Sequence, residues 1–213
     1  AFALGAQYDV PVYPCLSETR QRDAEAKKLR ASLPAYRARA MNAWHEGADG
    51  IYMFNFFDPH SPLWREVGRP ETLAPLEKLY TTGARGYGNL GSWYSGGAKF
   101  MNRDILNPSH PRKIDPGATA DVTLLVGEET RREPKPRIRL RLRFKEAPGA
   151  EVAVALNGIG LDAGTPDENW LEYPVPAAAV RQGDNAIAIT LPKGIASEVV
   201  LEDLVLHVAG AES

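Results

Sequence analysis

The chain has 213 residues, 44% of them hydrophobic, which suffices for one large or two small domains with a buried core. A formal net charge of −2 gives no electrostatic argument for binding nucleic acid or an anionic membrane, and the sequence contains no apolar run long enough for a transmembrane helix. The single cysteine, Cys15, excludes an internal disulfide framework and a cysteine-based zinc cluster but leaves the redox compartment open.

Helical and buried-strand patterns alternate over the first 82 residues. Val10–Leu16 is the first candidate strand, and its two prolines predict that it is short or irregular. The highly charged residues 20–31 indicate an exposed loop or a short helix. A longer helix is predicted next, with Ser32 as its N-cap, Pro34 in its first turn and Gly47 directly after its end.

The segment Gly50–Phe56 is predicted to be a parallel strand. Its run Ile51–Phe54 is apolar at every position, as expected for a strand covered by helices on both faces. A polar loop follows, and then a helix is predicted over Pro70–Tyr80, with Pro75 in its first turn. Helix, turn, apolar strand, polar tip and helix is the order of a (β/α)8 barrel, but only about two units fit here. We therefore expect the end of a barrel.

The rest of the chain differs in composition and in residue pattern. Residues 83–118 are rich in Gly, Ser, Asn and Pro and are predicted to form an irregular connector, whereas residues 119–213 carry short alternating strands separated by turns. These strands predict an antiparallel β-sandwich of the jelly-roll or galactose-binding-like kind. The candidates are Asp121–Val126, Arg137–Phe144, Glu151–Leu156, Leu171–Val175, Asn185–Leu191 and Val199–Val208.

Residues 36–44, 47–56, 63–68 and 71–73 resemble the last units of bacterial glycosyl-hydrolase-like (β/α)8 barrel proteins, in which a β-sandwich commonly follows the barrel. The resemblance covers about residues 8–82 and implies that Val10–Leu16 is strand seven and Gly50–Phe56 is strand eight. It also implies that strands one to six lie outside this chain, in a missing N-terminal barrel portion of the same protein. The implied partner is a carbohydrate, and nucleic acid and membrane are not expected.

Glu18 is the candidate catalytic residue that this resemblance implies. Glycoside hydrolysis uses two carboxylates that flank the scissile bond, and in many retaining barrel glycosidases the nucleophile follows strand seven. Glu18 lies directly after that strand, whereas its partner acid would lie on the absent strand four. This chain alone is therefore predicted to be inactive. The alternative is a solvated loop glutamate.

Polar residues at the tip of the second strand are candidates for substrate binding. Asn55 shares strand parity with Ile51 and Met53, and if that face points into the barrel Asn55 reaches its mouth. Asp58 and His60 are further candidates for binding sugar hydroxyls, although Asp-Pro and His-Ser-Pro also start turns. Tyr13 and Trp64 could stack on sugar rings or pack in a core. We expect no metal site and, without a nucleotide-binding motif, no cofactor.

Residues 137–144 alternate arginine with apolar residues, so four arginines share one face of the predicted strand. Pairing with acids on neighbouring strands, such as Glu151 or Asp184, is the simpler explanation, and contact with an anionic polysaccharide or a partner domain is the alternative. Nucleic acid is not favoured because the stripe has no interleaved exposed aromatic residues.

Three functions remain open at this stage: a glycoside hydrolase, a non-catalytic carbohydrate-binding or scaffold protein, and an interaction module whose first 82 residues only pack on the sandwich. A secreted or periplasmic location is compatible with each of them. If the chain is part of a barrel, Val10–Leu16 or Gly50–Phe56 should lack one strand neighbour within this chain, and that edge should expose apolar surface unless other chain material covers it.

Overall fold

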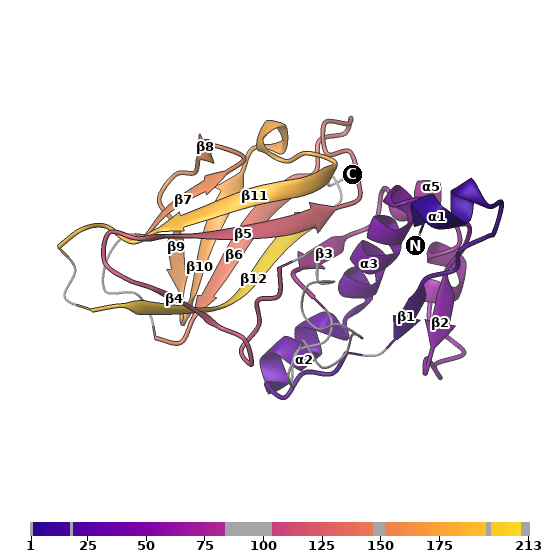
Figure 1. Ribbon diagram of the computed structural model, residues 1–213, viewed down its shortest axis with the longest axis horizontal. Helices are drawn as coiled ribbons and strands as arrows, with labels where there is room; N and C mark the ends of the chain where they lie inside the picture. Colours follow the sequence, from indigo (N-terminus) through magenta and orange to yellow (C-terminus); the bar gives the residue numbers. More distant parts are fainter. Residues whose placement is uncertain (1, 18, 84–103, 147–151, 195–196, 210–213) are drawn as a thin grey trace.

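The computed structural model describes residues 2–17, 19–83, 104–146, 152–194 and 197–209. Figure 1 shows a β-sandwich at one end of the molecule and a smaller helical lobe with the N-terminus at the other. The lobe consists of α1 (Phe2–Gln7), β1 (Cys15–Ser17), α2 (Ala24–Arg30), α3 (Leu33–His45), β2 (Tyr52–Phe54), α4 (Leu63–Glu66) and α5 (Pro70–Leu73). The described residues form no (β/α)8 barrel.

Helix α3 forms where its end signals predicted it. The Ser32 hydroxyl accepts a hydrogen bond from the Ala35 amide at 3.4 Å, which satisfies one of the free N–H groups of the first turn. Pro34 lies in that first turn. After the helix, Gly47 has φ +93°, a conformation that glycine adopts without steric cost. The segment of residues 20–31 also contains the short helix that was expected, α2, capped by Asp23.

Strands β1 and β2 pair in parallel and form a separate two-stranded sheet. Helix α3 covers one face of this sheet, and Ile51 and Met53 pack there against the lobe core of Leu16, Tyr36, Ala40, Met41, Leu63, Val67 and Leu73. The prediction that β2 is buried on both faces is wrong, because Tyr52 is 55% exposed and Phe54 43% exposed. The predicted open edges are confirmed: each strand has one neighbour among the described strands.

The helix predicted over Pro70–Tyr80 is also wrong. Helix α5 ends after one turn at Leu73, and residues 78–81 form strand β3 (Lys78–Thr81). Pro75 explains the early end, because it has no N–H to donate and disfavours helical backbone in the preceding residue. Lys78 then donates hydrogen bonds from Nζ to the carbonyls of Leu73, Ala74 and Leu76 at 2.8, 3.2 and 2.6 Å.

The sandwich has two antiparallel sheets. One contains β3, β12 (Val199–Ala209), β6 (Arg137–Phe144), β10 (Trp170–Val175) and β9 (Thr165–Asp167), with β4 (Arg112–Ile114) also paired to β12. The other contains β5 (Thr119–Val126), β11 (Gly183–Thr190), β7 (Ala153–Leu156) and β8 (Ile159–Gly160). The six strands predicted for this region are confirmed, and the sandwich with them. The jelly-roll topology and the domain boundaries at residues 82 and 118 stay predictions.

Apolar and polar residues alternate along the strands, and the apolar residues form the core of the sandwich. In β6, Ile138, Leu140, Leu142 and Phe144 are buried between the sheets, and the intervening arginines lie on the outer face. Acids of neighbouring elements pair with arginines of this stripe. Of the two acids that the sequence suggested, Glu151 lies outside the described residues and Asp184 lies on β11, in the other sheet. Acids on β10, β9, α2 and β12 take this role: Glu172 with Arg139, Asp167 and Glu172 with Arg141, and Asp23, Glu25 and Glu202 with Arg143.

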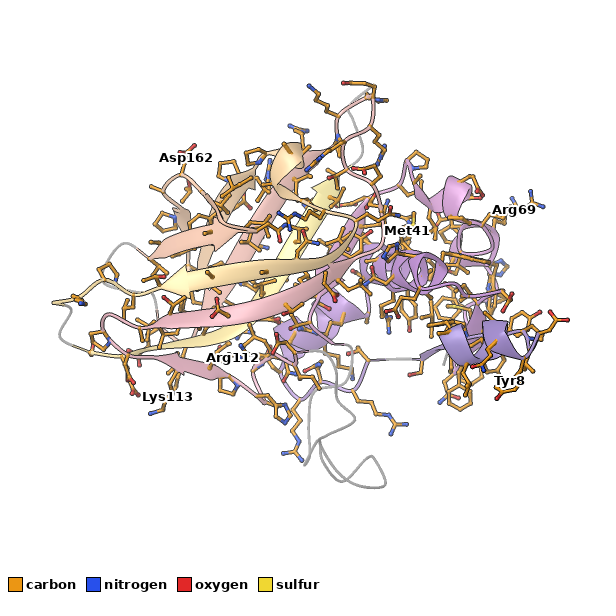
Figure 2. All side chains as sticks on the ribbon, turned by 45° about the horizontal axis from the view of Figure 1, so that its top comes forward. Tyr8, Met41, Arg69, Arg112, Lys113 and Asp162 are labelled. Atoms are coloured by element: carbon orange, nitrogen blue, oxygen red, sulfur yellow. The ribbon has the colours of Figure 1, made fainter. Side chains whose placement is uncertain are left out.

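A buried ion pair joins the lobe to the sandwich. Both terminal nitrogens of Arg30 in α2 donate to the carboxylate of Asp203 in β12 at 2.6 Å, with the two side chains 1% and 0% exposed. Helix α3 makes a second junction, where the Asn42 amide donates to the Leu125 carbonyl at 3.2 Å. Figure 2 shows Met41 at this seam and Tyr8 at the far end of the lobe.

Candidate functional site

The parallel pairing of β1 and β2 brings the two predicted site segments to one edge of the sheet. Ser17 lies opposite Phe54 in the register. Glu18 follows Ser17 directly, and Asn55 follows Phe54 directly, so the chain leaves both strands at the same end. Glu18 itself lies outside the described residues. The C-terminal edge of a parallel sheet is where α/β proteins place their ligands.

Asp58 shapes the loop after β2. Its Oδ1 accepts a hydrogen bond from the His60 amide at 3.0 Å, and its backbone carbonyl accepts one from the Trp64 indole at 2.7 Å. The first contact is an Asx-type turn, so Asp58 does form the turn that the sequence offered as an alternative to sugar binding. Because Asp58 and His60 are both exposed, polar groups of this turn remain accessible at the strand end.

Aromatic side chains accompany this turn. The rings of Phe56 and Trp64 meet edge to face, with centroids 5.3 Å apart. Trp64 remains 48% exposed and Phe57 is 86% exposed, so both offer apolar area to solvent beside the turn. An aromatic surface next to carboxylate, amide and imidazole groups has the chemistry needed to hold the apolar and hydroxyl faces of a sugar ring.

The orientation suggested for Asn55 needs correction. The face of β2 that carries Ile51 and Met53 packs on the lobe core and therefore points away from any barrel interior. Asn55 does not continue that face, since its φ of +53° places it in the left-handed region and ends the strand. Asparagine tolerates this conformation better than most residues, so the local turn explains why it stands here. Asn55 is exposed at the strand end.

Tyr13 lies away from the other candidates. Extending the register by two residues places it opposite Gly50, at the N-terminal end of the strand pair. Its ring covers that glycine, because a Cβ added to Gly50 would lie 2.6 Å from two ring carbons of Tyr13. The structure therefore brings Asn55, Asp58, His60 and Trp64 together and leaves Tyr13 at the opposite end of the sheet.

The sequence reasoning missed the exposed aromatic face of the two-stranded sheet. Tyr52 and Phe54 project from the side opposite α3, with ring centroids 6.4 Å apart, and Cys15 lies opposite Tyr52 in the register. A continuous apolar run contains no signal that tells a strand covered on both faces from one covered on a single face. This face adds apolar surface close to the candidate site.

A buried cluster with shifted pKa values, formed by Lys78, Tyr80 and Glu128, lies away from the ends of β1 and β2. Burial raises the pKa of Tyr80 and of Glu128, and it lowers the pKa of Lys78. Glu128 accepts from the Tyr80 hydroxyl at 2.8 Å and pairs with Lys78 at 3.2 Å. These groups satisfy one another between α5 and the sandwich, so we assign them a packing role rather than a catalytic one.

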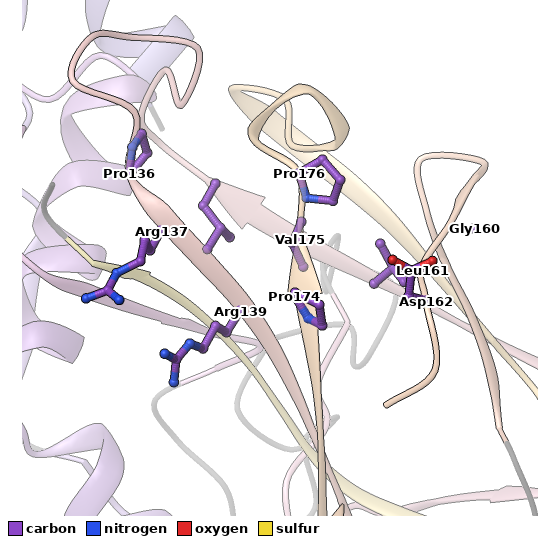
Figure 3. Close-up of a pocket in the computed structure, with 10 residues that line it drawn as sticks. Pro136, Arg137, Arg139, Gly160, Leu161, Asp162, Pro174, Val175 and Pro176 are labelled. Atoms are coloured by element: carbon purple, nitrogen blue, oxygen red, sulfur yellow. The ribbon is translucent and has the colours of Figure 1, made fainter. Parts of the chain in front are cut away.

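A pocket of about 370 Å³ lies on the sandwich and is lined by residues 136–139, 160–162 and 174–176. Figure 3 shows Arg137 and Arg139 on one side of Pro174, Val175 and Pro176, with Leu161 and Asp162 on the other. Its described lining contains two arginines of the stripe, Arg137 and Arg139, but none of Tyr13, Asn55, Asp58, His60 and Trp64. In the described part of the chain, no group of three His, Cys, Asp or Glu side chains could hold a metal ion, and no helix could span a membrane.

Comparisons with known proteins do not assign a family. No protein-family model matches the chain. No curated protein matches it either.

Several solved structures resemble parts of the fold weakly. A glycoside hydrolase of family 86 in complex with neoagarooctaose has a TM-score of 0.38 and 13% identity over 51% of this chain. A beta-porphyranase of that family from Bacteroides plebeius, a human gut bacterium, has a TM-score of 0.38 and 15% identity over 64% of this chain. This chain covers only 18% of the first listed family 86 structure and 21% of the porphyranase.

A carbohydrate-binding module of family 36, in complex with calcium and xylotriose, has a TM-score of 0.29 and 13% identity. The similarity covers 50% of this chain and 93% of that module. The similar structures are thus carbohydrate-active enzymes and carbohydrate-binding modules, and similarity at this level gives no activity to the present chain.

Proposed function

We propose that this chain is the C-terminal part of a glycoside-hydrolase-like protein that acts on a polysaccharide or oligosaccharide. The site lies at the C-terminal ends of β1 and β2, and Glu18 is its nucleophile. One observation carries the proposal: the parallel register that sets Ser17 opposite Phe54, so that Glu18 and the loop from Asn55 onward start from the same edge. The exposed rings of Phe57 and Trp64 beside that edge support a sugar ligand.

The proposal includes further strands that extend the two-stranded sheet. Parallel sheets are found with several strands and with both faces covered, because their crossover connections place helices on each side. Here β1 and β2 have one neighbour each, and Tyr52 and Phe54 are exposed on the uncovered face. The remaining barrel portion of the same protein would pair with the open edges and cover that face. A secreted or periplasmic location belongs to this proposal.

Glu18→Gln in the full-length protein tests the catalytic role. If Glu18 is the nucleophile, hydrolysis of the glycan falls by several orders of magnitude while glycan binding persists, since glutamine keeps the shape and loses the attacking carboxylate. Asp162→Asn removes an exposed carboxylate of the sandwich and serves as the control with unchanged rates. Unchanged hydrolysis in Glu18→Gln rules Glu18 out as the nucleophile.

The second candidate is a non-catalytic carbohydrate-binding or scaffold protein. The exposed aromatic residues favour it, because stacking on a sugar needs no pair of carboxylates. The two functions differ in one measurement on the full-length protein. Binding without hydrolysis by the unmodified protein supports this second candidate, provided that Trp64→Ala and Phe57→Ala weaken the binding.

A further inference from the structure

Arg39 of α3 contacts the peptide unit that leads into Glu18. Its Nη1 donates a hydrogen bond to the Ser17 carbonyl at 2.9 Å, and this carbonyl belongs to the peptide bond between Ser17 and Glu18. The other guanidinium nitrogens donate to the carbonyls of Arg30 and Ala35, each at 3.4 Å. One rigid, planar group therefore ties the end of β1 to α3 and to the end of α2.

The same side chain reaches the second strand end through aromatic rings. The guanidinium carbon of Arg39 lies 4.0 Å from the centroid of the Tyr36 ring, a cation–π geometry. Tyr36 meets Phe56 edge to face at 5.4 Å, and Phe56 meets Trp64 at 5.3 Å. Since the Trp64 indole donates to the Asp58 carbonyl, these contacts run without a gap from Ser17 to the turn after β2.

The surroundings strengthen these contacts. Burial lowers the pKa of Arg39 from its ordinary value, and an arginine in such a site still carries its charge at neutral pH. Hydrogen bonds from a charged donor are stronger than neutral ones, and a low local dielectric strengthens them further. Lysine has neither the planar fork nor the ring stacking, so it cannot replace the whole arrangement.

We propose that Arg39 is a positioning residue that holds the end of β1, at Ser17, in register with the loop of Asn55, Asp58 and Trp64. The inference rests on the proposed role of Glu18. The inference goes beyond the role of Glu18 because it states that a side chain of α3 aligns the ends of β1 and β2. A misplacement of about 1 Å at a reacting group lowers a rate by about 100-fold.

The first test compares Arg39→Gln, Arg39→Lys and Arg37→Gln in the full-length protein. Arg37 is the matched control: it lies on the same helix and makes a two-bond ion pair with Glu66 at 2.8 and 2.9 Å, away from Ser17. We expect Arg39→Gln to lower kcat about 100-fold with KM changed by less than about threefold. Arg39→Lys should restore part of kcat, and Arg37→Gln should leave it unchanged. Equal kcat in Arg39→Gln and Arg37→Gln, at equal folded fraction, overturns the proposal.

The second test needs no activity. Amide hydrogen exchange over residues 15–20 should speed up at least tenfold in Arg39→Gln of this chain and stay unchanged in Arg37→Gln, as expected if Arg39 secures the end of β1. Unchanged exchange in Arg39→Gln overturns the proposal whatever the kinetics show. If exchange changes as expected but the unmodified full-length protein hydrolyses no glycan, the proposed function fails while the anchoring by Arg39 stands.

Discussion

Removing one charge of the Arg30–Asp203 pair should be strongly destabilising. Arg30→Met leaves the Asp203 carboxylate buried, and among the hydrogen bonds described for it only that from the Leu204 amide, at 2.8 Å, then remains. The substitution also removes the hydrogen bond from Arg30 Nε to the Gly83 carbonyl at 2.7 Å. The pair connects α2 to β12, so its loss acts on the junction between lobe and sandwich.

The expected cost is about 3–5 kcal/mol, the range found when one partner of a buried ion pair is removed and the other charge stays buried. Domains of this size are stable by about 5–15 kcal/mol, so the loss is a large fraction of the total. Replacing both residues, as in Arg30→Met with Asp203→Leu, leaves no uncompensated charge. The double variant should therefore be more stable than the sum of the two single variants predicts.

Urea unfolding of this chain, followed by far-ultraviolet circular dichroism and by tryptophan fluorescence, measures these differences. In the unmodified chain both signals should change in one transition, because the buried pair couples lobe and sandwich. Lys113→Ala is the control: it breaks the exposed pair with Glu198 and should leave the midpoint unchanged. A loss below about 1 kcal/mol in Arg30→Met, no more than a surface pair contributes, would refute the reasoning.

Three further substitutions test the packing and electrostatics. Gly127→Ala should cost about 1–3 kcal/mol in urea unfolding, because its Cβ would lie 2.6 Å from the Met41 carbonyl carbon, whereas Gly160→Ala has open space and should be neutral. Glu128→Ala should cost about 1–3 kcal/mol, since the buried Tyr80 hydroxyl loses its acceptor; Glu129→Ala is its control. The hydrogen bond from Arg143 lowers the pKa of Asp23. The charged Asp23 carboxylate therefore stabilises the folded state above its unfolded-state pKa, and this contribution is lost as the pH falls through its folded-state pKa. Asp23→Asn should flatten the pH dependence of unfolding below about pH 4, the ordinary pKa range of an aspartate, and an unchanged slope would contradict this.

Local patterns account for most of the fold that could be predicted. The alternation of arginine and apolar residues in β6 predicted one buried face and one solvent-facing face, and the structure has both. Ser32 and Gly47 marked the ends of α3, since caps act within one turn of the residues they satisfy. Strand β3 was missed because leucines at residues 73, 76 and 79 have helical spacing, and only the pairing with β12 makes residues 78–81 a strand.

Contacts between distant residues account for what could not be predicted. Arg30 belongs to a highly charged segment and was expected to be exposed, yet it is 1% exposed, because its partner Asp203 lies 173 residues away. For the candidate site, the polar tip of β2 followed from local turn chemistry. The exposure of Tyr52 and the hydrogen bond from Arg39 to Ser17 depend on which side of the sheet α3 covers, which no local pattern contains.

Helix α3 connects the sandwich to the candidate site through opposite sides of one short segment. On one side, α3 contacts the two-stranded sheet: Tyr36 and Ala40 pack on the sheet face that α3 covers, and Arg39 bonds to the end of β1 and stacks on Tyr36. Asn42 donates to the Leu125 carbonyl of β5, and the backbone of Met41 leaves no room for a side chain at Gly127. A shift of α3 against the sandwich would thus move Arg39 and with it the peptide bond before Glu18. The buried Arg30–Asp203 pair also fixes α2, whose last residue accepts a hydrogen bond from Arg39. If Arg39 has the proposed positioning role, the sandwich therefore supports the position of the strand ends.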